Sequence, residues 1–236
     1  MQLIAETANF YRLTRFDMFN CFLVKEGSEL TLIDTNLPGS CDAILRAAAS
    51  LHSPITTIAL THAHFDHVGS LDALAKALPE AQIVMGERES RLLRGDFSLD
   101  ADESGKPLLG FKRSGAPIHK LLRERDQIGS LRVVASPGHS PGHISFLDVR
   151  DNSLMAGDSF ITQKGVIAAG VYNFFFPMPA WFSWNCGLAA ISAAKLAALK
   201  PSLLAVGHGP TLMSPSAKMD RAVEIAFQQH PPQIQK

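Results

Sequence analysis

Short apolar runs alternate with longer amphipathic stretches along the whole chain. The runs predict strands at residues 20–25, 30–34, 57–60, 82–85, 131–135, 144–148, 153–156 and 203–206. Apolar residues at helical spacing predict helices at residues 41–51, 70–78, 186–199 and 214–229. Because strands and helices interleave, the pattern is typical of an α/β protein, and we treat residues 1–236 as one domain.

Two stretches depart from this pattern. Residues 86–130 are the most polar part of the chain and predict a surface insertion that forms a partial lid. Residues 165–185 predict an apolar loop, in which Pro177 and Pro179 leave no run long enough for a membrane span. Its aromatic side chains either pack in the core or at a homodimer interface, or they form the wall of an apolar substrate pocket. The residues assigned to that wall are Tyr172, Phe175, Phe176 and Trp181.

Charge and cysteine content narrow the classes of function. The chain carries 22 Lys and Arg against 22 Asp and Glu, which argues against a nucleic-acid partner. Cys21, Cys41 and Cys186 are odd in number and widely spaced, which predicts free thiols, small buried side chains and a reducing compartment. Residues 1–18 lack the apolar core of a secretory signal, so we expect a cytoplasmic protein.

The strongest chemical signal is the run Thr61-His62-Ala63-His64-Phe65-Asp66-His67, directly after the strand predicted at 57–60. Two imidazoles two residues apart point the same way while the chain stays extended. Asp66 and His67 follow one turn later and face a neighbouring point. Imidazole and carboxylate suit zinc, iron or manganese, so the run offers ligands for two adjacent metal ions.

Three further metal-competent residues follow other predicted strands. His139 comes after residues 131–135, Asp158 after 153–156, and His208 after 203–206. Glycine and proline beside each of them permit tight turns. Because α/β proteins tend to place sites at the carboxyl ends of their strands, we expect these residues to converge there.

Together these residues resemble the signature of the metallo-β-lactamase superfamily of hydrolases, a His-x-His-x-Asp-His run followed by a distant His, Asp and His. The resemblance implies an α+β four-layer αβ/βα sandwich, with two mixed β-sheets face to face and helices outside. It also implies two metal sites with Asp158 as the bridging ligand. The first holds His62, His64 and His139, and the second holds Asp66, His67 and His208.

Two other residues fit supporting roles around these ligands. Asp34, in Leu32-Ile33-Asp34-Thr35, resembles the family's first motif and is expected to orient a ligand loop. His143 ends the second Pro-Gly-His and is expected to have a structural or supporting role. His64 occupies the place that resembles Glu in the redox di-iron branch, which favours two Zn²⁺, with Fe or Mn as alternatives.

The resemblance implies hydrolysis of an ester-like bond by a metal-bridging hydroxide, with Asp66 orienting the nucleophile or moving its proton. The pattern is closest to the lactonase and glyoxalase II-like branches. Lactonases share Pro-Gly-His-x-Pro-Gly-His but carry a tyrosine where this chain has Ile161. We predict a lactonase or esterase that acts on a lipophilic small molecule. The alternatives are a thioesterase, a phosphoesterase, a mononuclear iron persulfide dioxygenase and a non-catalytic binding module.

Overall fold

The computed structural model describes residues 1–174 and 177–231. The chain divides into two compact units. The first comprises Met1–Asp96 and Gly110–Leu122, and the second comprises Phe97–Leu109 and Arg123–Lys236. The polar stretch predicted as an insertion is therefore shared between the two units, and its role as a lid stays a prediction.

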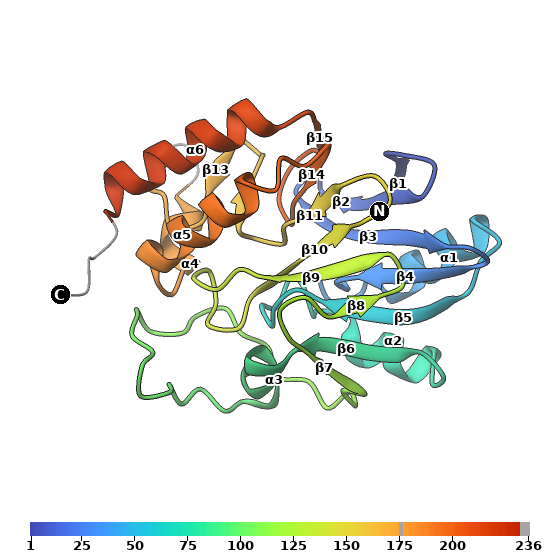
Figure 1. The fold of residues 1–236 in the computed structure, drawn as a ribbon. Helices are drawn as coiled ribbons and strands as arrows, with labels where there is room; N and C mark the ends of the chain where they lie inside the picture. Colours follow the sequence, from blue (N-terminus) through green and yellow to red (C-terminus); the bar gives the residue numbers. More distant parts are fainter. Residues whose placement is uncertain (175–176, 232–236) are drawn as a thin grey trace. The chain divides into compact units, whose positions relative to one another are not determined.

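A mixed sheet of seven strands forms the centre of the first unit (Figure 1). Its order follows the chain: β1 (Gln2–Ala5), β2 (Phe10–Arg15), β3 (Phe19–Glu26), β4 (Glu29–Ile33), β5 (Ile55–Leu60), β6 (Gln82–Gly86) and β7 (Lys120–Leu122). Strands β1 to β4 pair antiparallel, whereas β4 to β7 pair parallel. The hairpin predicted at residues 20–34 is confirmed as β3 and β4.

The parallel strands bring two loops and the start of one helix of the first unit to one sheet edge. Residues 34–40 leave β4 and lead to α1 (Cys41–Ser50), and residues 61–70 leave β5 and lead to α2 (Leu71–Ala77). Helix α3 (Glu87–Arg94) follows β6 directly. Because neighbouring parallel strands end at the same edge, side chains from these three segments can meet there.

The second unit has its own mixed sheet of six strands. Its order is β15 (Leu212–Met213), β14 (Leu203–Ala205), β11 (Ser153–Met155), β10 (Ile144–Asp148), β9 (Leu131–Ala135) and β8 (Gln127–Ile128). Only β11 and β14 pair parallel in it among the described residues. A separate two-stranded sheet joins β12 (Phe160–Ile161) and β13 (Ile167–Ala168).

Three helices complete the second unit: α4 (Met178–Phe182), α5 (Cys186–Ala197) and α6 (Ser216–Gln229). In Figure 1, α5 and α6 lie side by side. Their small residues Ala190, Ala193 and Ala222 share a hydrophobic core with Phe160 and Leu204. The predicted combination of two mixed sheets with helices is confirmed. The stretch predicted as an apolar loop, residues 165–185, includes β13 and α4. No helix in the described ranges is long and apolar enough to cross a membrane.

Candidate metal centre

The first donor set comprises His62, His64, Asp66 and His67, all in the loop that leaves β5. All four side chains are buried. The ring centroid of His62 lies 4.6 Å from that of His64 and 4.0 Å from that of His67. Three imidazoles therefore gather at the carboxyl end of one strand.

Asp34, at the end of β4, fixes the orientation of two of these imidazoles. Its Oδ1 accepts the backbone N–H of Thr61 at 2.8 Å, and its Oδ2 lies 2.8 Å from both Thr61 Oγ1 and His67 Nδ1. A carboxylate only accepts, so His67 carries its proton on Nδ1 and keeps the lone pair on Nε2. Thr61 Oγ1 gives its proton to Asp34 and accepts from His62 Nδ1 at 3.0 Å. In both rings Nε2 is therefore the nitrogen that could bind a metal ion.

The loop after β4 holds the far end of the first donor set. The carbonyl oxygen of His67 accepts from Thr35 twice, from N–H at 2.6 Å and from Oγ1 at 2.9 Å. A Cβ atom added to Gly69 would collide with the backbone of Asn36, Leu37 and Pro38. The two loops approach so closely that only glycine fits at residue 69.

Glu89, which was not predicted from the sequence, supports the other side of this loop. Glu89 lies on α3, is fully buried, and accepts the backbone N–H of Ala63 at 2.9 Å. The carbonyl of Ala63 accepts from Lys112 N at 3.0 Å. The available signal was helical spacing, because Glu89 shares a face of α3 with the buried Leu92 and Leu93.

The second donor set comprises His139, Asp158 and His208, each in a loop that leaves β9, β11 or β14. All three side chains are buried. Asp158 Oδ2 lies 3.0 Å from His208 Nε2 and 3.4 Å from His139 Nε2. One carboxylate oxygen therefore faces the ring nitrogens of both histidines.

His143 connects the Asp158 loop to the sheet through a directed chain of hydrogen bonds. Its Nε2 accepts the backbone N–H of Asp158 at 3.1 Å, so its proton is on Nδ1, 2.9 Å from Ser136 Oγ. Ser136 Oγ lies 2.8 Å from Ser145 Oγ, which donates to the carbonyl of Ala156 at 3.3 Å. The chain closes only with a neutral imidazole that accepts at Nε2.

Residues between α4 and α5, together with the first turn of α5, support the His139 side chain and its loop. Its Nδ1 lies 3.3 Å from Ser183 Oγ, which gives its own proton to Pro179 O at 2.6 Å, so His139 donates from Nδ1 and presents Nε2. Trp184 N donates to the carbonyl of His139 at 3.0 Å. At Gly138, with φ of 132°, an added Cβ would collide with the backbone of Ala189. The ligand loop therefore rests directly on the helix.

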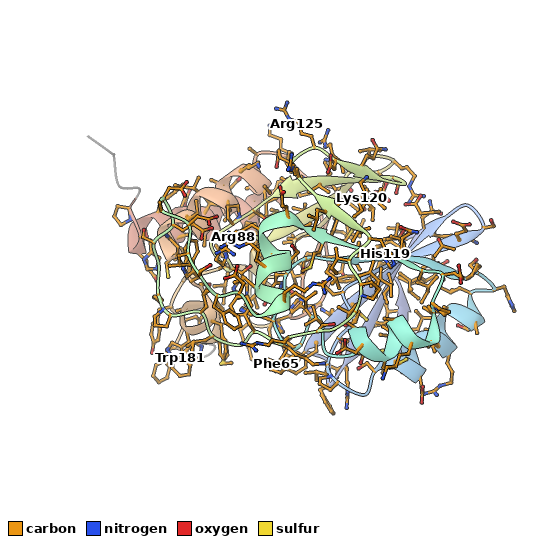
Figure 2. All side chains as sticks on the ribbon, turned by 90° about the horizontal axis from the view of Figure 1, so that it is seen from below. Phe65, Arg88, His119, Lys120, Arg125 and Trp181 are labelled. Atoms are coloured by element: carbon orange, nitrogen blue, oxygen red, sulfur yellow. The ribbon has the colours of Figure 1, made fainter. Side chains whose placement is uncertain are left out.

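The residues predicted to form a substrate wall have different surroundings. Trp181, on α4, is 59% exposed (Figure 2). Tyr172 is 53% exposed, so neither residue packs in the core. Trp184, in contrast, is buried. Phe175 and Phe176 lie outside the described residues. The exposure of Tyr172 and Trp181 is compatible with a homodimer interface and with a substrate wall.

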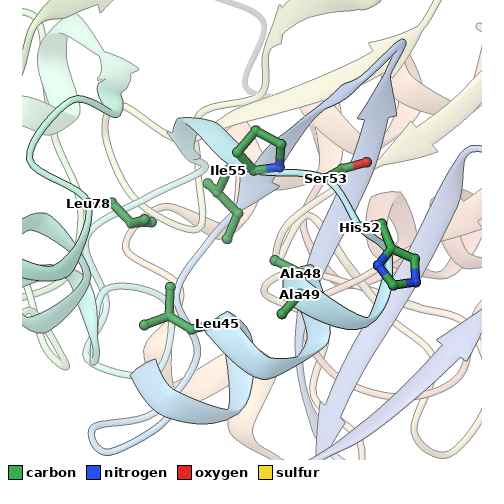
Figure 3. A pocket seen from close by; sticks show the side chains of 8 residues that line it. Leu45, Ala48, Ala49, His52, Ser53, Ile55 and Leu78 are labelled. Carbon is green, nitrogen blue, oxygen red and sulfur yellow. The ribbon is translucent and has the colours of Figure 1, made fainter.

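A pocket of about 340 Å³ lies in the first unit (Figure 3). It is lined by residues of α1, including Leu45 and Ala48, and by Ile55 at the start of β5. His62 follows the opposite end of that strand, and six residues at about 3.3 Å each separate the two ends by roughly 20 Å. The pocket is therefore not part of the first donor set.

Comparison with known proteins identifies relatives across most of the chain. The family described as the Metallo-beta-lactamase superfamily matches residues 15–208. The Bacillus subtilis protein named "Uncharacterized protein YobT" is 47% identical over 88% of this chain and 90% of its own length. "Probable metallo-hydrolase YflN" of the same organism is 29% identical over 84% and 82%. The solved structure of TTHA1623, in a di-iron-bound form, has 23% identity and a TM-score of 0.64 over 93% of this chain and 97% of that one.

Proposed function

Because the chain belongs to the metallo-β-lactamase superfamily and is a metallo-hydrolase, we propose that its two donor sets bind a pair of Zn²⁺ ions and that it hydrolyses a lipophilic lactone or ester. The predicted resemblance to this family is thereby confirmed, as is the fold class. The metal, the ligand assignment and the substrate are the proposed part.

The observation that carries the metal proposal is the direction of the buried imidazoles. In the first donor set His62 and His67 give their Nδ1 protons to groups of the fold, and in the second His139 does the same. This arrangement is typical of metal ligands, whose second ring nitrogen donates to a carboxylate, hydroxyl or carbonyl. The fit is good, since every donor is nitrogen or oxygen, and the Nδ1 contacts of His62, His67 and His139 leave Nε2 as their atom for a metal.

We assign one ion to His62, His64 and His139, and the other to Asp66, His67 and His208, with Asp158 serving both. When bound, the ions supply Lewis acidity toward an ester carbonyl and toward a water nucleophile. Beside such a pair, Asp66 would orient the nucleophile or take up its proton. Asp34 keeps His67 in the required tautomer, and His143 holds the backbone of Asp158.

The proposed metal is zinc because the donors match the imidazole-rich sites that suit zinc, and because His64 occupies the place that resembles Glu in the redox di-iron branch. The solved relative TTHA1623 holds two irons, so iron is the first alternative for this chain. Metal analysis of the purified protein tests the proposal. Two zinc ions per chain support it, whereas one iron per chain points to a mononuclear dioxygenase.

The proposal of a lipophilic substrate rests on the exposed apolar side chains beside the second donor set. Tyr172, Phe174, Met178 and Trp181 are between 40% and 78% exposed. Ser183 and Trp184, which follow them directly, contact the ring and the backbone of His139. Apolar side chains next to a few polar groups are typical of small-molecule sites. We also propose that the protein is cytoplasmic, that its substrate is a small molecule, and that it has no nucleic-acid partner.

The test is acid release from acyl-homoserine lactones of increasing chain length by the zinc-loaded protein, with H64A as the blank. We expect release that rises with acyl length and is lost in H64A. Release of acid from thioesters or phosphoesters alone would replace the lactonase proposal while leaving the metal proposal intact. Activity in metal-free protein would contradict both.

A further inference from the structure

Outside the donor sets, a lysine and a cysteine of the second unit lie in direct contact. Lys106 Nζ is 3.3 Å from Cys186 Sγ and donates to the carbonyl of Ala180 at 2.9 Å. Cys186 is the first residue of α5 and is 8% exposed. The two residues are 80 positions apart in the chain, so the fold alone creates this pair.

The segment that carries Lys106 is anchored on both sides of the lysine. We call residues 97–109 the strap. Its Lys106 N–H donates to Trp184 O at 2.7 Å, and Asn185 Nδ2 donates to Ser104 O at 2.8 Å. Gly105 lies so close to the Trp184 indole that an added Cβ would collide with it. The backbone of Lys106 is therefore fixed, and the position of its amine is defined by the contacts with Cys186 Sγ and Ala180 O.

Cys186 differs from the other two cysteines in the charge that faces its sulfur. Burial, and next the charge of Asp34, raise the pKa of the Cys21 thiol, which is fully buried in β3. Burial and the neighbouring Asp42 raise the pKa of the Cys41 thiol. Both thiols are thereby kept in the unreactive form. Cys186 faces the amine of a lysine instead.

We propose that Lys106 and Cys186 form an oxidative cross-linking site that hydrogen peroxide converts to a sulfenamide. In the first step, Cys186 Sγ attacks one peroxide oxygen, the O–O bond breaks, and water leaves, so that the thiol is oxidised to a sulfenic acid. Lys106 then loses one proton to solvent. Its Nζ attacks Sγ, the S–O bond breaks, and a second water leaves. The thiol has lost two electrons, and peroxide has gained them.

The cross-link would join the strap to α5 covalently. The strap continues into residues 110–112, whose backbone is hydrogen-bonded to the His62–Phe65 loop through Phe65 N and Gly110 O at 2.9 Å. Oxidation would therefore constrain the strap, which leads directly into residues 110–112, the backbone that supports the loop of the first donor set. A fixed contact geometry gives the amine a high effective concentration at the sulfenic acid, ahead of water or a second peroxide.

Peptide mapping by mass spectrometry after treatment with dilute hydrogen peroxide tests the proposal. The expected product is a peptide pair linked through Lys106 and Cys186 that is lighter than the two free peptides by two hydrogen atoms. Dithiothreitol should reverse it. Hydrogen–deuterium exchange of residues 97–109 should slow in the cross-linked protein. Cys186 that gives only a dimedone adduct in the wild type, or that stays reduced, would overturn the proposal.

Two variants make the result specific. K106R keeps the positive charge but has a poorly nucleophilic guanidinium, so Cys186 should accumulate as sulfenic or sulfinic acid without a link. C41S removes a cysteine away from the pair and should leave the cross-link unchanged. A link that persists in K106R, through another amine, would contradict the assignment of Lys106. None of these measurements depends on the substrate proposed above.

Discussion

His67 Nδ1 lies 2.8 Å from Asp34 Oδ2, and the same carboxylate oxygen accepts from Thr61 Oγ1. Asp34 adopts a left-handed backbone conformation, with φ of 58°, and is almost fully buried. Both oxygens of this buried carboxylate thus take part in three hydrogen bonds with one ligand loop. Asp34 thus couples the end of β4 to the tautomer of a proposed ligand on the next strand.

We predict that D34N weakens metal binding without unfolding the protein. Asn has one accepting oxygen and a donating nitrogen, so it cannot accept from Thr61 N, Thr61 Oγ1 and His67 Nδ1 together, and the support of the ligand loop is weakened. Loss of such a supporting partner typically lowers metal affinity by about 10- to 100-fold. Competition with a chromogenic zinc chelator measures the affinity. D42N, on the exposed face of α1, is the control, and equal affinities of D34N and wild type would contradict the prediction.

The second prediction concerns His143. In H143L the backbone N–H of Asp158 and the hydroxyl of Ser136 lose a buried partner, which should cost about 1–3 kcal/mol per group. H143Q restores an acceptor close to the position of Nε2 and should recover most of the metal stoichiometry. Urea denaturation and metal analysis measure the two effects separately. If both variants bind the same amount of metal, His143 serves packing alone.

The positions of the proposed ligands were predictable because each follows a strand whose apolar run is easy to identify. Strands β9 and β10 have the predicted bounds, 131–135 and 144–148. Strands β8, β12, β13 and β15 were missed, since each has only two residues and shows no periodicity. β1 and β2 were missed as well, although they are longer. β1 has only four residues, none of them fully buried, and in β2 Arg12 and Thr14 interrupt the apolar positions.

The supports of the ligands were less predictable than the ligands themselves. Asp34 and His143 belong to recognisable motifs, but Glu89 stands in a polar segment where a buried carboxylate is unexpected. Contacts such as Lys106 with Cys186 join residues 80 positions apart. Local pattern carries no information on such pairs, because only the tertiary fold brings the two side chains together.

Close backbone approach at Gly138 gives a third prediction. G138A should destabilise the second unit by about 2 kcal/mol or more, because the new Cβ collides with Ala189 and the residue needs a positive φ. G187A, in the first turn of α5, places its Cβ 3.7 Å from Asn185 Oδ1 and should be neutral or stabilising. Thermal unfolding of both variants tests the contrast. Equal melting temperatures of G138A and G187A would contradict the prediction and show that the loop at residue 138 can shift to accommodate a Cβ atom.

Metal removal gives a fourth prediction. Dialysis against a chelator should lower the melting temperature by roughly 5–10 °C, because a ligand at 100 times its dissociation constant contributes about 2.7 kcal/mol to stability. Added Zn²⁺ should restore the original value. Scanning calorimetry measures the shift, with H64A as the control in which zinc has a smaller effect. A melting temperature that does not respond to zinc would contradict the proposed metal pair.

The two tryptophans separate a substrate wall from core packing. Trp184 is 3% exposed, and W184A should lower stability by about 3–5 kcal/mol, as loss of a buried aromatic residue usually does. Trp181 is 59% exposed, so W181A should leave stability within about 0.5 kcal/mol. If Trp181 contacts the acyl chain, W181A should raise KM for long-chain lactones and leave KM for short-chain lactones nearly unchanged. Steady-state kinetics over a chain-length series measures this. The matched control is F16A, which truncates an exposed phenylalanine of the first unit. An equal effect of W181A on KM at all chain lengths would favour a homodimer interface instead of a substrate wall.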